Sequence, residues 1–381
     1  MKFAVVFAIG LAIAVPAWAS DLVQSTLDDL HAEHEFPGVT VAWTGADGVV
    51  HSRATGWADP DAGVPMTVES RMLAASIGKS FVAAAVLSLH ADGALDLDDP
   101  LSVWIGDRPW FDRLPNHAAL TLRQLLTHTG GLPDHVDLPA FRAFFMSLGP
   151  DDAAPEPETL IAFILDAEPL FSAGEGWAYS DTGFLLVGLA IEAAAGVPWT
   201  EVVRTRFLDP LALADTEPSD RRDLARLVVG FSALGDPTGS PVRTLDTDGR
   251  MVWHPGIEGA GGGFVTTAAD LARWGWHLWS GRALEAAYLD EMFDAVSIDP
   301  DAPGRVYGLA VSIDHDGAFG EVRGHGGWIP GYVSTLRYYP AQDIAIAIQI
   351  NTDVGMLGAR GAFDGIERAI STVILDESER Q

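Results

Sequence analysis

Apolar and polar positions divide the chain into strands near both ends and helices between them. Near the start, recurring apolar residues predict a helix over residues 22–34. A Pro-Gly pair then introduces a strand at residues 39–43, and a turn at residues 45–48 leads into a second strand at residues 49–56. An antiparallel pair is therefore expected at the beginning of the fold.

The middle of the chain, from residue 120 to about 213, is mostly helical in pattern, and the end returns to strands. Helices are expected at residues 122–128, 140–148, 159–167 and 184–195, with an exposed acidic connection at 151–158; strands are expected at 307–313, 333–339 and 344–350, followed by a helix at 363–375.

This order predicts an α/β (α+β) fold in which both termini contribute to one antiparallel sheet flanked by helices, with an inserted helical subdomain. We expect residues 20–90 and 214–381 to form the sheet domain and residues 91–213 the mainly helical subdomain. The active site is expected between them.

A glycine cluster at residues 259–263 precedes a predicted helix that runs to residue 279, with Thr267 and Asp270 as an approximate capping box. Glycine clusters also bind phosphate, but no strand-GxxxxGKS-helix pattern surrounds this one. Close backbone packing is the better interpretation.

The first nineteen residues have the pattern of a secretory signal: Lys2, an apolar run at residues 3–15, and Ala17-Trp18-Ala19. We therefore expect residues 1–19 to be removed and the protein to be exported, to a periplasm or the medium, without a stable membrane span. No cysteine is present, which excludes disulfides, thiolate metal sites and a cysteine nucleophile.

The formal net charge of −30 becomes −31 once Lys2 is removed, and the acidic residues are spread along the chain. Such a surface repels nucleic acid and anionic lipid, so neither is expected as a partner. With 48% hydrophobic residues the chain can bury a large core. Its oligomeric state is left open.

Lysine occurs only at positions 2 and 79, against twenty-one arginines. Lys79 lies three residues after Ser76 at the expected start of a helix that stops at Asp92-Gly93, so both side chains share one face. The positive end of the helix dipole favours an oxyanion near Ser76, and lysine, unlike arginine, can act as a base. Ser76 is a candidate nucleophile, although Ser-x-x-Lys alone is common.

Two further patterns accompany this one. Tyr179-Ser180-Asp181 is expected in a loop before the helix at residue 184, and His325-Gly326-Gly327-Trp328 is expected just before the strand at residue 333. In this order the three resemble the elements Ser-x-x-Lys, Tyr-x-Asn and Lys/His-x-Gly of the penicillin-recognising serine hydrolases, which include class C β-lactamases, DD-carboxypeptidases, D-aminopeptidases and β-lactamase-fold esterases. The resemblance spans about residues 36–352.

The resemblance implies that Ser76 attacks an acyl carbon while Lys79 and Tyr179 share the proton transfer, with no cofactor and no metal. It implies an oxyanion hole made by the backbone N–H groups of Ser76 and Trp328. Gly326 and Gly327 would let substrate lie close to the strand, His325 would line the pocket, and Trp328 would contact substrate.

Two departures from the family pattern affect the chemistry. Asp181 replaces the usual asparagine and favours the charged form of Lys79, so either Asp181 is protonated or Tyr179 is the working base. His325 replaces the lysine of many β-lactamases, and a neutral imidazole holds a substrate carboxylate less firmly. Arg323 and Arg337 are the candidates to compensate.

The other histidines carry less weight. We expect a structural hydrogen bond for His128 and a solvated face for His31 and His34, which are three residues apart. Trp274, Trp276 and Trp279 are expected in the core or lining the cleft.

The sequence thus predicts an exported serine hydrolase that forms an acyl-enzyme with a small-molecule or peptide substrate. A small ester or a D-amino-acid amide or peptide is favoured over a β-lactam. The alternative is a penicillin-binding-like sensor that is acylated without turnover.

Overall fold

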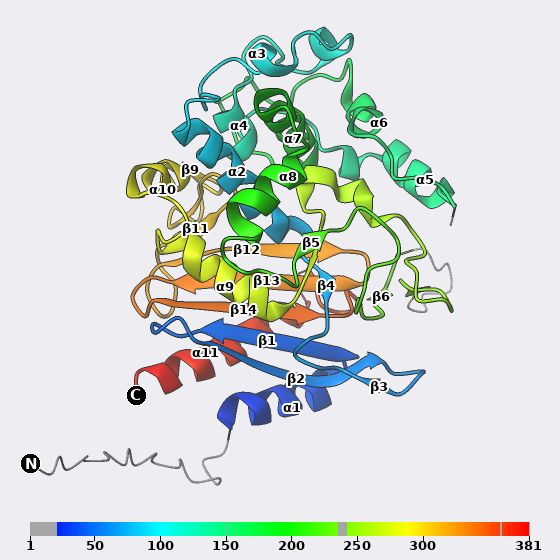
Figure 1. Ribbon diagram of the computed structural model, residues 1–381, viewed down its shortest axis with the longest axis vertical. Coiled ribbons are helices and arrows are strands. Elements are labelled where there is room, and N and C mark those ends of the chain that lie inside the picture. The colour runs from blue at the N-terminus through cyan, green and yellow to red at the C-terminus, as the bar shows by residue number, and fades with distance from the viewer. Residues whose placement is uncertain (1–20, 150, 235–241, 359, 381) are drawn as a thin grey trace, which may run out of the picture.

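The computed structural model describes residues 21–149, 151–234, 242–358 and 360–380, so the expected signal segment lies outside the described residues. Within these ranges, nine strands form one antiparallel sheet at the base of the molecule (Figure 1). Across the sheet the strands are β3 (Val64–Pro65), β2 (Val50–Asp59), β1 (Gly38–Thr44), β14 (Ile344–Ile350), β13 (Tyr332–Tyr339), β12 (Val322–Ile329), β11 (Ser312–Asp314), β10 (Arg305–Tyr307) and β9 (Val296–Ser297).

The centre of the sheet joins the two ends of the chain. β1 pairs with β2 on one side and with β14 on the other, so Val39 faces both Thr55 and Ile350. β14 is buried along its whole length because helices cover both faces of the sheet. The predicted antiparallel sheet built from both termini is confirmed.

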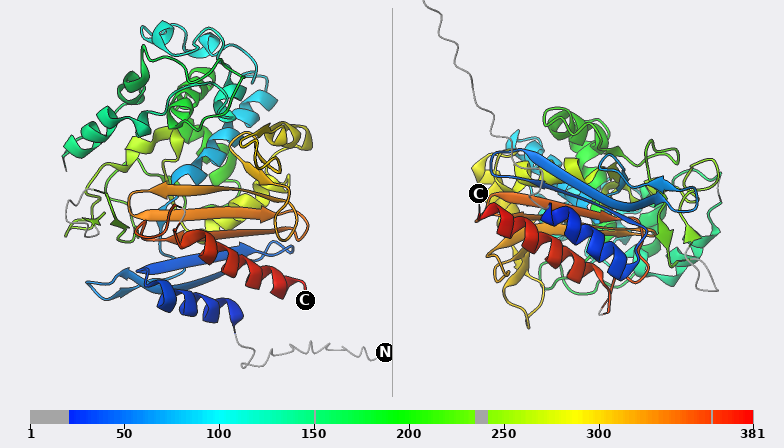
Figure 2. Two further views of the ribbon diagram at one scale, coloured as in Figure 1. Left: turned by 180° about the vertical axis from the view of Figure 1, so that it is seen from behind. Right: turned by 90° about the horizontal axis from the view of Figure 1, so that it is seen from below.

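One face of the sheet is covered by α1 (Leu22–His34) and α11 (Phe363–Ser378), which lie side by side (Figure 2). Ile366, Ile370 and Ile374 of α11 pack in one apolar cluster with Leu27 of α1. The predicted first helix is confirmed at its exact limits, because its apolar spacing matches a helix that buries one stripe.

The opposite face is covered by α9 (Ala268–Trp279), which contacts β1 and β14. Trp274 and Trp279 are fully buried there, as predicted, and Trp276 is half-buried. The remaining helices are α2 (Lys79–Ala91), α3 (Ser102–Ile105), α4 (Leu122–Leu126), α5 (Pro139–Ser147), α6 (Pro157–Ile161), α7 (Asp181–Ala195), α8 (Trp199–Val203) and α10 (Ala286–Phe293), most of them gathered above the sheet in Figure 1.

Two local predictions were wrong in their limits. The single strand expected at residues 307–313 is the pair β10 and β11, because the chain turns at Ala310, which has a φ of 56° and donates its N–H to Leu126 O. The helix expected at residues 159–167 is only the short α6 followed by a 3-10 turn that ends at Ile164.

The segment His325 to Trp328 was expected before a strand and lies inside one, β12. Its glycines lower the local strand propensity, so pattern alone does not reveal it. The strand forms because β13 offers a continuous ladder, with His325 opposite Leu336 and Trp328 opposite Val333.

Among the helices of the described ranges, no single one is both long and apolar enough to cross a membrane. The bent pair formed by α7 and the segment Trp199–Leu208 reaches that length and composition only when joined across a 75° bend.

Candidate active site

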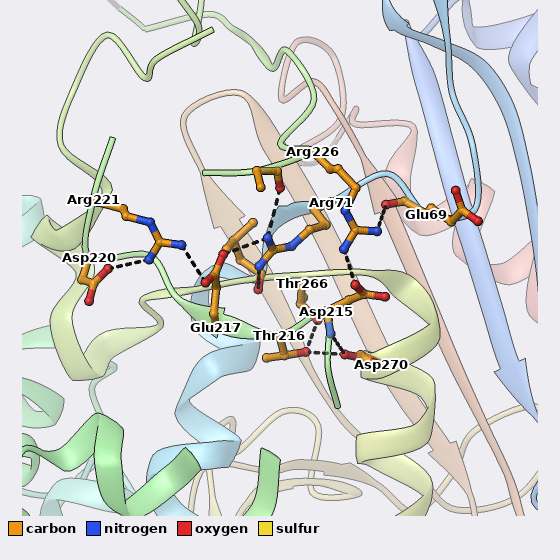
Figure 3. A network of polar contacts seen from close by, with 12 residues as sticks. Glu69, Arg71, Asp215, Thr216, Glu217, Asp220, Arg221, Arg226, Thr266 and Asp270 are labelled. Carbon is orange, nitrogen blue, oxygen red and sulfur yellow. Dashed lines mark hydrogen bonds and ion pairs between the residues drawn. The ribbon is translucent and has the colours of Figure 1, made fainter. Parts of the chain in front are cut away.

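A short, firmly held strand leads to Ser76. β4 (Met72–Leu73) pairs with β8 (Phe264–Thr266), which also pairs with β5 (Glu217–Pro218). Just before β4, Arg71 donates to Glu217 Oε1 at 2.8 Å and to Ala225 O at 3.0 Å (Figure 3). Because the Arg71 side chain is almost fully buried, these bonds fix the start of the segment that carries Ser76.

The backbone turns sharply at Ala75, whose φ of 49° lies in the left-handed region that costs a non-glycine residue about 1 kcal/mol or more. Ser76 follows in a 3-10 turn, and within residues 71–80 it is the only side chain that is not fully buried. A Cβ on Gly262 would lie 2.4 Å from Ala75 O, so the predicted close packing of the glycine cluster is confirmed.

Lys79 is fully buried at the start of α2, and three acceptors surround its ammonium group. Its Nζ lies 3.1 Å from Ser76 Oγ and also contacts Asp181 Oδ1 and Gly261 O. Three acceptors match the three N–H donors of a lysine ammonium. Ser76 and Lys79 therefore meet as the spacing of three residues predicts.

Asp181 was expected in a loop and is instead the first residue of α7, where Ser180 caps the helix by accepting the Gly183 N–H at 3.3 Å. The backbone N–H of Asp181 donates to Asp134 Oδ2 at 2.9 Å. Burial, and then the charge of Asp181, raise the pKa of Asp134 to about 7. Two carboxyl groups thus lie near Lys79 at this point.

Tyr179 is half-buried beside Lys79, with its hydroxyl oxygen buried, and Lys79 Nζ lies 4.9 Å from the centre of the phenol ring. Burial and then Asp181 raise the pKa of Tyr179 well above its ordinary value of 10.0, and the nearby Ser76 side chain opposes this rise. No hydrogen bond of ordinary geometry reaches the hydroxyl within the described residues. Tyr179 is therefore a neutral phenol that lies close to Lys79.

His128 packs against Tyr179 with ring centres 4.1 Å apart and ring planes tilted by 37°, and its Nδ1 accepts the Ser180 N–H at 3.2 Å. The predicted structural hydrogen bond is confirmed. Burial, followed by the charge of Lys79, lowers the pKa of His128 well below 6.5, so the ring is neutral. Sequence reasoning missed its contact with Tyr179, because residues 128 and 179 meet only in the folded chain.

His325 lies behind Tyr179, with both ring nitrogens occupied. Its Nδ1–H donates to Gly326 O at 2.6 Å, and the Tyr307 hydroxyl donates to Nε2 at 2.7 Å. Burial and then Lys79 lower the pKa of His325 to about 3, so this imidazole is neutral. The candidate compensating cations are bound elsewhere, Arg323 to Glu321 at 2.7 Å and Arg337 to Glu367 at 2.8 Å.

β12 brings Gly327 and Trp328 to the segment before Ser76. A Cβ on Gly327 would lie 2.3 Å from Ala74 O, so only glycine permits this approach. β11 pairs with β12 only as far as Gly324. Beyond that residue no described strand pairs with β12 on the side away from β13, and Gly326 and Trp328 are exposed.

Ser76 opens into a pocket of about 240 Å³. Its walls are mostly apolar and aromatic, and a few polar and charged side chains lie among them. Sequence reasoning identified Ser76, Asp181 and Trp328 among them but missed Glu258 and Arg142. The other lining residues are His135, Val136, Phe141, Phe145, Leu234, Trp253, Ile257, Gly261, Ile329 and Pro330.

Known proteins resemble this chain in sequence and in fold. The family model described as Beta-lactamase matches residues 23–369. Penicillin-binding protein 4* of Bacillus subtilis (strain 168) is 26% identical over 83% of this chain and 68% of that protein. Esterase EstB of Burkholderia gladioli is 30% identical over 77% of this chain and 74% of that protein.

Among solved structures, the D-amino acid amidase from Ochrobactrum anthropi SV3 complexed with L-phenylalanine amide has a TM-score of 0.77 and 26% identity, covering 94% of this chain and 98% of that one. The match extends over the sheet, the helices above it and the segments that carry Ser76, Tyr179 and His325. The chain therefore belongs to the beta-lactamase family, as a serine hydrolase that acts through an acyl-enzyme.

Proposed function

We propose that this enzyme hydrolyses small esters and D-amino-acid amides or peptides in preference to β-lactams. The observation that carries the proposal is the charge of the pocket. Asp181 and Glu258 line it beside Ser76, and the histidine at the position of the family's lysine is neutral. Among the described lining residues, the free cation is Arg142, which is exposed on α5. A β-lactam carboxylate would therefore find no unpaired cation beside Ser76 among the described lining residues, because Lys79 already contacts Asp181.

In the proposed reaction, Ser76 Oγ bonds to the acyl carbon as its proton passes to Lys79, which is 3.1 Å away. Lys79 first yields a proton to Asp181, its direct contact. The raised pKa of Tyr179 keeps the phenol protonated, which fits a general acid that protonates the leaving oxygen or nitrogen as its bond to carbon breaks. Water then attacks the acyl carbon and gives its proton to the Tyr179 phenolate. Lys79 returns a proton to Ser76 Oγ as its bond to carbon breaks, and Asp181 returns its proton to Lys79. The backbone N–H groups of Ser76 and Trp328 would hold the oxyanion.

The test offers three probes to the protein and to Ser76→Ala: a p-nitrophenyl ester, a chromogenic cephalosporin and a fluorescent penicillin, each followed by turnover and intact mass. We expect fast ester turnover that is lost in Ser76→Ala. A stable penicillin adduct without ester turnover would instead support the sensor alternative.

Asp181→Asn tests the proton path. If its rates and their pH dependence equal those of the parent enzyme, the role given to Asp181 is wrong.

We further propose that residues 91–213 form one domain and residues 20–90 and 214–381 the other. We also propose that residues 1–19 direct export, which the apolar run and the Ala17-Trp18-Ala19 cleavage pattern support. Sequencing the N-terminus of exported protein tests the cleavage site.

A further inference from the structure

Glu258 is an acidic side chain of the pocket that the proposed reaction does not use. It belongs to the segment Pro255–Gly261, whose last carbonyl accepts from Lys79. Its Oε2 is buried and has no hydrogen-bond partner in the described part of the chain, although the residue as a whole retains some exposure to the pocket. Burial raises the pKa of Glu258 to about 8, against the opposing effect of Lys79.

A buried carboxyl without a partner is unfavourable, and such groups are uncommon in folded proteins. The nearby cation cannot satisfy it, because Lys79 is already surrounded by Ser76, Asp181 and Gly261. Arg142 on α5 also donates no hydrogen bond to Glu258 Oε2, which has no partner in the described residues. Glu258 is therefore an acidic group of the pocket that no described side chain pairs with. A cationic ligand would supply the missing partner.

We infer that Glu258 is the counter-ion for an ammonium group carried by the acyl part of the substrate. This inference rests on the proposed function and narrows it. The apolar walls formed by Phe141, Phe145 and Trp253 would hold a hydrocarbon or aromatic side chain of the same acyl group. The substrate class is thus an amino-acid ester or amide with a free amine and an apolar side chain.

The test compares Glu258→Gln with the parent enzyme on two p-nitrophenyl esters, one of D-phenylalanine and one of 3-phenylpropanoic acid, which lacks the amine. We expect Glu258→Gln to lower kcat/KM for the amine substrate by about 10- to 100-fold, the range of a charge-assisted hydrogen bond. The neutral ester should change by less than about threefold. Glu192→Gln is the matched control, because burial also raises the pKa of Glu192 outside the pocket.

A second measurement tests whether Glu258 binds the ammonium group or only stabilises the fold. Binding of phenethylammonium to the Ser76→Ala protein at pH 7, measured by calorimetry in two buffers of different ionisation enthalpy, should release protons as Glu258 ionises. The release should vanish in the double variant with Glu258→Gln. The other ionisable groups that face this part of the pocket, Lys79, Asp134, His135, Arg142, Tyr179 and Asp181, are the same in both proteins.

Equal loss on both esters, or equal binding and proton release in both proteins, would overturn the role of Glu258 and leave the proposed function standing. Absence of turnover of every ester and amide by the parent enzyme would instead remove the proposed function itself.

Discussion

Arg71 and Lys79 are two buried cations on the same stretch of chain, and their surroundings differ. Arg71 shares Glu217 with Arg221, so two cations flank one carboxylate (Figure 3). Lys79 contacts Asp181 and also lies within the charge range of Asp134 and Glu258. The first cluster holds its charges fixed. In the second, carboxyls outnumber cations, so protons can redistribute, which is what acid and base catalysis needs.

Exchanging the cation at the reactive position should have the largest effect. We expect Lys79→Arg to lower ester kcat/KM by at least about 10³-fold, because arginine stays protonated and cannot accept the Ser76 proton. The reciprocal change, Arg71→Lys, should keep kcat within a few-fold at temperatures well below its unfolding transition. Lys79→Arg that folds and keeps a tenth of the activity would contradict the comparison.

Removing the structural cation should instead affect stability. Arg71→Met removes a partly buried ion pair and should reduce the free energy of unfolding by about 1–3 kcal/mol, measured by urea denaturation. The activity of each folded molecule should remain. Ser76→Ala is the control and should shift stability by less than about 1 kcal/mol. A stable Arg71→Met protein would mean that Arg221 alone satisfies Glu217.

The carboxyl excess near Lys79 should appear as a dependence of stability on pH. Asp134 is ionised above about 3.8 when unfolded but only above about 7 when folded, so it lowers stability increasingly as pH rises from 4 to 7. Relative to the parent protein, Asp134→Asn should therefore gain about 4 kcal/mol of stability between pH 4 and pH 8, because each pKa unit corresponds to about 1.4 kcal/mol. Buried His325 lowers stability in acid in both proteins, so its effect cancels in the difference. Melting curves of both proteins at both pH values measure this gain. A stability difference that does not change with pH would contradict the raised pKa of Asp134 as its cause.

The outer part of the Arg71 cluster should matter least. Arg221 is half-exposed, and its bonds to Glu217 and Asp220 lie at the surface. Arg221→Ala should cost less than about 1 kcal/mol, and the loss should shrink in high salt. A larger loss that is independent of salt would mean that Arg221 stabilises the fold as strongly as the buried Arg71 does.

The sequence predicted what depends on local spacing. The helix at residues 22–34 follows from its apolar stripe, and the meeting of Ser76 and Lys79 follows from one helical turn. The strands of both termini also follow from their alternating and continuous apolar runs. These features need no knowledge of distant contacts.

The rest depends on contacts between distant segments. Glu258 lies just before the glycine cluster and looked like part of a loop, while Asp134 follows a turn-like Gly-Leu-Pro run. Only the packing of Pro255–Gly261 and of the Asp134 loop against α7 brings these carboxyls to Lys79. β12 was missed for a similar reason, because its partner strand outweighs the weak strand propensity of its glycines.

The burial of Lys79 also means that cleavage by a lysine-specific protease would report unfolding of the protein. In residues 3–381 a lysine-specific protease has one possible cleavage site, after Lys79, and that side chain is fully buried at the start of a core helix. Cleavage requires this helix to open, so each cut marks one unfolding event and yields two fragments of known mass. The rate of cleavage would then measure, without a label, how much a bound substrate analogue stabilises this helix against opening.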